Sequence, residues 1–152
     1  MIGPVVTHYL FPEELLIPAE NVAHVMPEHS VMHAALVLSS LGYNRIPVID
    51  DDGKFAGTIG LSTIMGDLLD WDEISGEKMK TLKVEDVMDR KNNVLVQGYD
   101  DAQLLREMVH FNFLPVVDEK NVFLGIVTRK EILKRINFLA HELEKEYRIE
   151  KK

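Results

Sequence analysis

Residues 128–131, Thr-Arg-Lys-Glu, combine a hydroxyl, two cations and a carboxylate where an apolar run passes into a helical pattern. Thr128 and Glu131 have the spacing of a capping box, in which both side chains satisfy the first N–H groups of a helix. A capping box does not account for Arg129 and Lys130, because the helix dipole disfavours cations in the first turn. Two cations beside free N–H groups favour an anion site suited to phosphate, with a merely capped helix as the alternative.

The same sequence frame occurs earlier in the chain without these side chains. Residues 57–63 read GTIGLST, with Gly60 at the position of Thr128 and Thr63 at the position of Glu131. No cation occupies the intervening positions. We therefore expect this copy to bind phosphate poorly or not at all, and the chain to hold one competent site.

A constant offset relates two repeats and aligns IPVID at 46–50 with LPVVD at 114–118. Apolar periodicity and turn residues predict a strand, helix, strand, turn, strand and helix in each repeat. The expected strands are residues 22–25, 45–50 and 55–61 in the first repeat, and 93–96, 113–118 and 122–127 in the second. The expected helices are residues 31–42, 64–69, 102–110 and one that begins at 129.

The chain is thus predicted to be an α/β (α+β) protein with short segments around its two repeats. The expected boundaries are an N-terminal segment 1–16, repeat one 17–71, a polar linker 72–83, repeat two 84–138 and a C-terminal helix extension 139–152. Pro12 is expected to open a short N-terminal helix. One apolar stripe continues to Tyr147, which predicts a long last helix that needs a partner surface.

Composition restricts the class of protein. The 152 residues carry a net charge of −8, which argues against a nucleic acid polymer as partner, although a small phosphorylated ligand needs only a few cations. Cysteine is absent, no run is long enough to span a membrane, and the first residues lack the pattern of a signal peptide. A cytoplasmic protein is the expectation. His29 and His33 lack a third metal ligand, and the DDDG stretch reads as a turn, so no metal site is expected.

The paired blocks IPVID…FAGTIG and LPVVD…FLGIVT resemble a tandem pair of CBS domains, also called a Bateman module, over residues 17–138. The whole chain is similar, more narrowly, to stand-alone CBS proteins of Gram-positive bacteria that bind cyclic di-AMP. The resemblance implies two βαββα units packed about a pseudo-twofold axis, with adenosine ligands in the clefts between them. Each cleft would take its first strand and the loop before Pro-Val from one repeat, and the Thr-x-x-Asp stretch from the other.

The resemblance therefore predicts one ligand site built from both repeats. Its expected residues are Asn21, Val22, Ala23, His24, Tyr43, Asn44, Arg45, Ile46, Pro47, Thr128, Arg129, Lys130 and Glu131. Backbone groups of Val22 and Ala23 would meet an adenine edge, and Tyr43 would either stack on a base or simply end a helix. Arg45 would be a further cation near phosphate or a solvated turn residue. Glu131 replaces the ribose-binding Asp of the family, so direct ribose contact is in question.

The resulting functional hypothesis is a non-enzymatic sensor of an adenine nucleotide. A ligand with adenine and two phosphates suits the expected site, and CBS sites for AMP or ATP more usually keep the ribose-binding Asp that this chain lacks. Cyclic di-AMP is therefore favoured over AMP, ADP or ATP. No cofactor is expected. The resemblance implies a homodimer and a regulated partner enzyme, either the stringent-response alarmone synthetase or pyruvate carboxylase. The competing hypotheses are a protein-interaction module with ligand-free clefts and a nucleotide-converting enzyme. The enzyme is disfavoured because the sequence lacks a nucleophile or metal motif.

Overall fold

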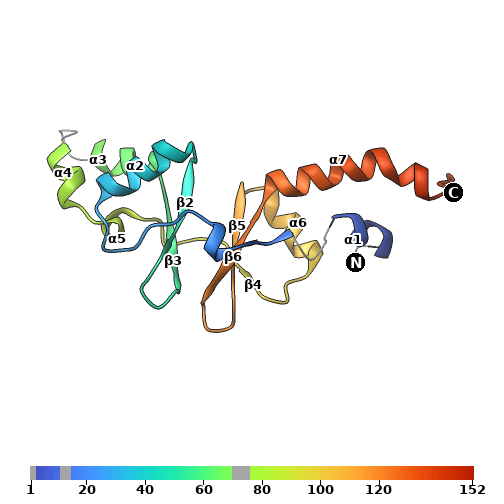
Figure 1. The fold of residues 1–152 in the computed structure, drawn as a ribbon, viewed down its shortest axis with the longest axis horizontal. Coiled ribbons are helices and arrows are strands. Elements are labelled where there is room, and N and C mark those ends of the chain that lie inside the picture. Colours follow the sequence, from blue (N-terminus) through green and yellow to red (C-terminus); the bar gives the residue numbers. More distant parts are fainter. Residues whose placement is uncertain (1–2, 11–14, 70–75) are drawn as a thin grey trace.

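The structure is a computed structural model that describes residues 3–10, 15–69 and 76–152. Its helices are α1 (Pro4–Leu10), α2 (Val31–Leu41), α3 (Leu61–Leu69), α4 (Gly76–Thr81), α5 (Val84–Val87), α6 (Asp101–Met108) and α7 (Arg129–Glu146), with the 3-10 turn η2 (Ala19–Asn21). Its strands are β1 (Ile17–Pro18), β2 (Arg45–Ile49), β3 (Phe55–Gly60), β4 (Leu95–Val96), β5 (Phe113–Val117) and β6 (Phe123–Thr128). The strands of both repeats stand in the middle, with α2–α5 outside repeat one and α6 and α7 outside repeat two (Figure 1).

Local chemistry explains the predicted helices, as α2 illustrates. The Ser30 hydroxyl accepts a hydrogen bond of 3.1 Å from the His33 N–H and caps the first turn. Ala34 and Leu38 lie on one fully buried face. Gly42 ends the helix in the left-handed conformation, with φ of 68°, where the missing Cβ avoids strain. The helix thus begins and ends as the sequence indicated.

The two hairpins have the same turn chemistry. β2 pairs with β3, and β5 with β6, in antiparallel register. In the first turn the Asp50 carboxylate accepts from the N–H groups of Asp52 and Lys54, each at 2.9 Å. Asp118, its equivalent in repeat two, makes both bonds again at 2.8 and 2.9 Å. The DDDG stretch is therefore a side-chain-stabilised turn, as predicted.

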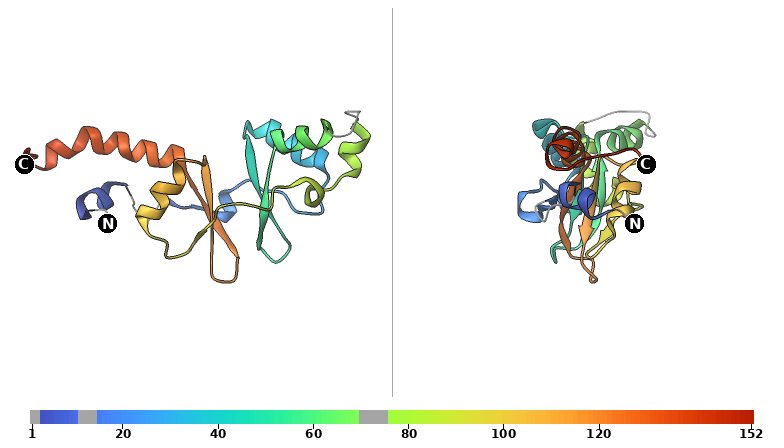
Figure 2. Two further views of the ribbon diagram at one scale, coloured as in Figure 1. Left: turned by 180° about the vertical axis from the view of Figure 1, so that it is seen from behind. Right: turned by 90° about the vertical axis from the view of Figure 1, so that its right-hand side faces the viewer.

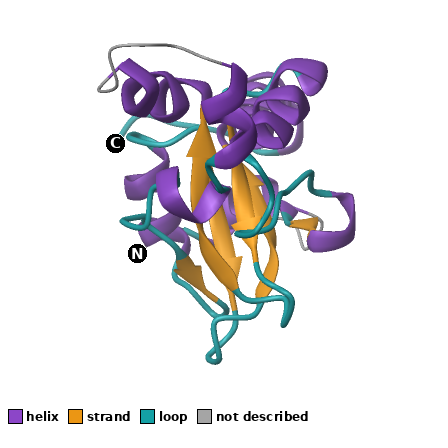
Figure 3. Cartoon of the chain, turned by 90° about the vertical axis from the view of Figure 1, so that its left-hand side faces the viewer, coloured by secondary structure: helices purple, strands orange, loops and turns teal. Residues whose placement is uncertain are grey.

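A reciprocal contact between the hairpin turns relates the two repeats. The Phe55 N–H donates to the Asn121 carbonyl at 3.0 Å, and the Phe123 N–H donates to the Gly53 carbonyl at 2.9 Å. The rings of Phe55 and Phe123 stack with centroids 6.3 Å apart. Both pairs of equivalent residues are separated by the repeat offset, so the contact lies on a pseudo-twofold axis. Viewed along the long axis, the turns point to the same side, away from most helices (Figure 3).

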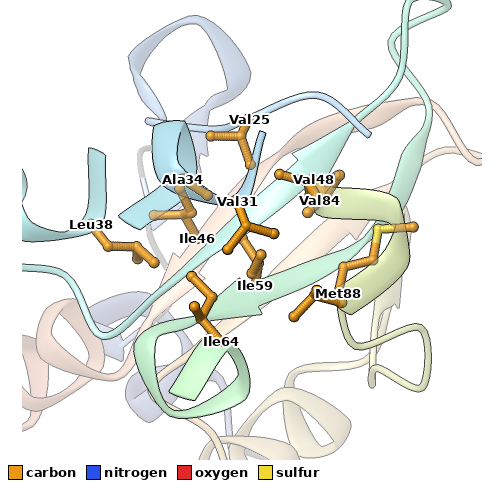
Figure 4. Close-up of a cluster of buried hydrophobic side chains, with 11 residues drawn as sticks. Val25, Val31, Ala34, Leu38, Ile46, Val48, Ile59, Ile64, Val84 and Met88 are labelled. Atoms are coloured by element: carbon orange, nitrogen blue, oxygen red, sulfur yellow. The ribbon is translucent and has the colours of Figure 1, made fainter. Parts of the chain in front are cut away.

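Each repeat has its own hydrophobic core. The core of repeat one gathers side chains from α2, β2, β3, α3 and α5 (Figure 4). Its buried residues are Val25, Val31, Ala34, Leu38, Ile46, Val48, Ile59, Ile64, Val84, Val87 and Met88. The second core contains Leu15, Leu95, Leu104, Met108, Leu114, Val116, Val127 and Ile132. Leu15 precedes repeat one yet belongs to the core of repeat two, so the chain crosses between the units.

Two crossing segments connect the repeats. β1 pairs with β6 at the edge of the four-stranded sheet, whose order is β1-β6-β5-β4. Asp89, near the start of repeat two, bridges Thr58 on β3 through two backbone hydrogen bonds of 2.8 and 3.0 Å. A Cβ on Gly57 would collide with the Asp89 carbonyl, and a Cβ on Gly125 with the Ile17 carbonyl. Each crossing thus depends on a glycine.

The structure corrects several predicted elements. Residues 22–25 form no strand, because Val25 alone bridges β2, at Val48, before the chain turns at His29. The predicted linker contains α4, because Met79 and Leu82 pack against the first core and the Leu82 carbonyl accepts from Val31 N–H at 2.8 Å. The N-terminal helix is α1, while the predicted start at Pro12 lies outside the described residues.

The long C-terminal helix is confirmed as α7, which projects beyond repeat two with α1 beside it (Figures 1 and 2). Within the described part of the chain, none of the helices is both long and apolar enough to cross a membrane.

Substitution of Gly57 by alanine is expected to destabilise the fold by about 1–3 kcal/mol, because the added methyl group forces the Asp89 segment away from β3. Gly66→Ala is the matched control, since a Cβ at this position of α3 meets nothing within 4 Å. The control is expected to stabilise the protein by about 0.5–1 kcal/mol. Urea unfolding of the three proteins measures both effects, and equal stability of Gly57→Ala and the parent would contradict the crossing contact.

Candidate functional site

A cleft of about 820 Å³ lies between the repeats, and all the predicted site residues except His24 line it. His24 does not line this cleft: it is exposed, and its Nδ1 lies 3.2 Å from the Val22 carbonyl. The crossing of β1 onto β6 explains how the others meet. It carries residues 21–23 of repeat one across to residues 128–131 of repeat two, as the resemblance implied.

Thr128 and Glu131 form half of the predicted capping box. The Thr128 hydroxyl accepts from the Glu131 N–H at 3.2 Å and caps α7. The Glu131 carboxylate turns along its own helix to Lys134, with Oε1 and Nζ 3.3 Å apart. The carboxylate is therefore engaged on the helix surface, and the first turn of α7 faces the cleft beside the cations.

Arg129 has a structural role that the sequence did not reveal. Its guanidinium donates to the Met108 carbonyl at 3.0 Å, the Val109 carbonyl at 3.2 Å and the Asn112 side-chain oxygen at 3.1 Å. These bonds cap the end of α6. All three acceptors are uncharged, and no carboxylate of the described residues forms an ion pair with Arg129. Its positive charge is therefore held in place without being cancelled.

Lys130 lies on the surface of the cleft at the first turn of α7. Its side chain is exposed, and the part of the chain that the structure describes gives it neither a hydrogen bond nor an ion pair. Lys130 and Arg129 thus bring two uncancelled charges to the N-terminus of a helix of 18 residues. Backbone N–H groups and cations together attract a phosphate. We name residues 128–131 the phosphate end of the cleft.

The opposite wall supplies an apolar surface and an aromatic ring. Pro47 is buried in β2 and forms the floor together with the backbone of Ile46, whose side chain lies in the core of repeat one. Val22 and Ala23 lie beside them as irregular backbone. Tyr43 lines the cleft and is 53% exposed, which makes it a candidate for stacking on a base. Aromatic and apolar walls with a few polar groups are typical of sites for small ligands.

Arg45 was expected to be either a cation near the phosphate or a solvated turn residue, and the structure shows a third arrangement. Its guanidinium donates to the Thr58 hydroxyl at 2.8 Å and to the Thr63 hydroxyl at 3.1 Å, and it lies 3.9 Å from the Asp89 carboxylate. It is therefore not a solvated turn residue. It also points to the start of α3, beside Gly60, rather than to the phosphate end of the cleft. The sequence could not show this direction, because a long side chain can reach either way.

The structure also shows that the two expected clefts are one. The same cavity continues past Thr58 and Asp89 to a second wall from repeat two. Lining residues there that we did not predict are Lys91, Asn92, Asn93, His110, Phe111, Asn112, Phe113 and Pro115. The repeat offset contained the signal for part of this wall, since it aligns Phe111 with Tyr43 and Pro115 with Pro47.

Shifted pKa values occur outside the cleft. Burial, with a smaller contribution from Asp101, raises the pKa of Tyr99, and burial together with Asp100 raises the pKa of Asp101. Repulsion from Glu28 raises the pKa of Asp51 in the first hairpin turn. Among the described residues, no group of three His, Cys, Asp or Glu side chains is placed to hold a metal ion.

Known proteins are similar to this chain in sequence and in fold. The CBS domain family matches residues 13–70 and 84–137. Cyclic di-AMP receptor B of Bacillus subtilis is 32% identical over 138 residues, which cover 87% of this chain and 90% of the receptor. The crystal structure of CbpB from Streptococcus agalactiae is 33% identical, with a TM-score of 0.89, over 99% of this chain and 96% of that one.

A further solved structure is CbpB from Listeria monocytogenes in complex with cyclic di-AMP. It is 38% identical with a TM-score of 0.78, and the match covers 83% of this chain and 94% of that one. The chain therefore belongs to the CBS-domain family, as a tandem pair of CBS domains.

Proposed function

We propose that this protein is a non-enzymatic sensor that binds cyclic di-AMP in the cleft between its CBS domains. The observation that carries the proposal is the pair of uncancelled cations, Arg129 and Lys130, opposite an apolar wall from the other repeat. Phosphate would occupy the first turn of α7, and adenine would lie between Tyr43 and Pro47. The relatives named for cyclic di-AMP support this choice of ligand.

AMP, ADP and ATP are the alternative ligands. They offer one base and a phosphate group or chain at a single end, whereas cyclic di-AMP carries two bases and two separate phosphates. One oxygen of the Glu131 carboxylate pairs with Lys134 on the surface of α7. We therefore place cyclic di-AMP ahead of the mononucleotides, and a ligand-free interaction module last.

Cyclic di-AMP is expected to raise the melting temperature of the purified protein by several degrees. A ligand at 100 times its dissociation constant adds about 2.7 kcal/mol of stability, which is a shift of this size for a protein of 152 residues. Differential scanning fluorimetry with AMP, ADP, ATP, S-adenosylmethionine, cyclic di-AMP and cyclic di-GMP makes the comparison. If no nucleotide changed the melting temperature, the result would contradict the sensor and favour a ligand-free protein-interaction module.

Lys130→Ala is expected to weaken cyclic di-AMP binding about ten-fold without changing stability, because this exposed cation makes neither a hydrogen bond nor an ion pair with the described residues. Lys145→Ala is the matched control, since it removes the same charge at the far end of α7, where Lys145 forms an ion pair with Glu142. Isothermal titration calorimetry gives the affinities. Equal affinities of the two variants for cyclic di-AMP would contradict the proposal that residues 128–131 bind its phosphate.

Arg129→Ala is expected to lose both ligand affinity and stability. The variant lacks three hydrogen bonds to the end of α6, and at a partly exposed site these contribute about 1–3 kcal/mol in total. Affinity should fall ten-fold or more, as for Lys130→Ala. Unfolding in urea without ligand separates the two effects, and an Arg129→Ala variant of unchanged stability would contradict its role at α6.

We further propose that the protein is a homodimer in the cytoplasm and relays its ligand state to a partner enzyme. Apolar side chains at equivalent positions of the two repeats are exposed: Leu41 with Val109, and Met65 with Leu133. α3 and α7, which carry Met65 and Leu133, lie along the same side of the molecule (Figure 1). A second copy could cover this side in both repeats at once. The alarmone synthetase and pyruvate carboxylase remain the proposed partners.

The double variant Met65→Glu, Leu133→Glu is expected to be monomeric, because a dimer would bury four unpaired carboxylates. Ile149→Glu, which adds charge at the exposed C-terminal end, is the control and should remain dimeric. Light scattering coupled to gel filtration gives the mass. A parent protein with the mass of one chain would contradict the dimer.

A further inference from the structure

We infer that Asn112 is a positioning residue for the phosphate end, because its neutral amide holds the Arg129 guanidinium without cancelling its charge. Asn112 lies in the loop between α6 and β5, immediately ahead of β5. It acts through Arg129 rather than on the ligand. The inference rests on the proposed function and concerns what keeps that site attractive to a phosphate.

Asn112 contacts Arg129 through its backbone and through its side chain. The Asn112 carbonyl accepts a hydrogen bond of 2.8 Å from the Arg129 N–H, and the Asn112 side-chain oxygen accepts one of 3.1 Å from Nη1 of the guanidinium. The other two acceptors that the described residues offer this guanidinium are the backbone carbonyls of Met108 and Val109. Asn112 therefore supplies the side-chain acceptor of the three, whose charge a single substitution can change.

Asn112 and Arg129 lie where the cleft meets a neighbouring groove. Both residues line the cleft, and both also line a groove of about 580 Å³ along α7. The remaining residues of this groove are Lys130, Leu133, Lys134 and Asn137. Because Asn112 lines the same cavity as the phosphate end, a phosphate bound there would experience any charge carried by residue 112.

Repeat one contains the equivalent loop residue without the equivalent side-chain contact. The repeat offset aligns Asn44 with Asn112, and the Asn44 carbonyl accepts from the Leu61 N–H at 3.3 Å, as the Asn112 carbonyl does from the Arg129 N–H. Leu61 has no guanidinium, so this position offers the Asn44 side chain no second bond. The backbone contact thus belongs to the shared fold, whereas the side-chain contact is specific to the repeat that carries the phosphate end.

The nearby arginine of repeat one has an acidic neighbour instead. The Arg45 guanidinium lies 3.9 Å from the Asp89 carboxylate. An amide oxygen and a carboxylate oxygen both accept hydrogen bonds from a guanidinium, but the carboxylate also carries a negative charge that offsets the cation and repels phosphate. Asparagine rather than aspartate at position 112 therefore leaves Arg129 both fixed in place and positively charged.

Asn112→Asp tests this role, because aspartate keeps the shape and the acceptor oxygen of asparagine and adds one negative charge. In the full chain, the variant should bind cyclic di-AMP about ten-fold more weakly than the parent in calorimetric titration. Its midpoint of urea unfolding should equal or exceed that of the parent, since a carboxylate bonds a guanidinium more strongly and is favoured near the N-terminus of α7. A merely structural residue would lose stability and affinity together.

Two further variants separate the charge from the hydrogen bond. Asn112→Ala removes the acceptor without adding charge, so it should unfold at lower urea than Asn112→Asp and lose only about two-fold in affinity, through a less ordered Arg129. Asn137→Asp is the matched control for charge, since Asn137 is exposed and lines the groove along α7 but not the cleft. Its affinity for cyclic di-AMP should stay within about two-fold of the parent value.

Three results would overturn the inference while leaving the proposed function intact. They are parent affinity in Asn112→Asp, an equal loss of affinity in Asn137→Asp, and a loss of stability in Asn112→Asp that accompanies its loss of affinity. The second result would indicate a general effect of charge along α7, and the third a change of the fold. If the parent protein bound no cyclic di-AMP, the proposed function itself would fail.

Discussion

The close approach of backbone to glycine at two crossings is the constraint on which the rest of this structure depends. Gly57 accommodates the Asp89 carbonyl, and Gly125 accommodates the Ile17 carbonyl, at positions where a Cβ would collide. Each crossing attaches the first residues of one repeat to the last strand of the other. Neither half of the cleft could form within a single repeat, because its walls come from both. The reciprocal contact of Phe55 and Phe123 at the hairpin turns then fixes the two units about one axis.

Pseudo-symmetry of the backbone and asymmetry of charge together account for the proposed binding mode. The constant offset between the repeats gives equivalent walls and equivalent helix starts. Side chains then make the two ends different: Arg129 is held by uncharged oxygens, whereas Arg45 lies beside a carboxylate. An uncancelled charge favours phosphate. One fold used twice therefore carries two cleft ends of different charge.

Arg129 also connects ligand binding to stability. Its hydrogen bonds to the end of α6 hold the guanidinium in one position before any ligand arrives, so little side-chain entropy remains to be lost on binding. The same bonds place the loop that contains Phe111 next to the phosphate end. A phosphate that binds Arg129 would compete with these hydrogen bonds and so change the position of the loop. Ligand binding could thereby alter the surface that a partner protein contacts.

The sequence by itself determined the repeats, the hairpins, the capped helices and nearly all of the proposed site, because these follow from periodicity, turn chemistry and a fixed offset. Asp50 and Asp118, for example, define their turns through bonds to N–H groups that lie close by in the chain. Tertiary structure decided the rest. Residues 22–25 failed to become a strand, and α4 formed within the predicted linker, because both depend on packing against distant segments. The directions of Arg45 and Arg129, the exclusion of His24 and the merging of two clefts into one were likewise decided by contacts between residues far apart in the chain, which local sequence patterns do not encode.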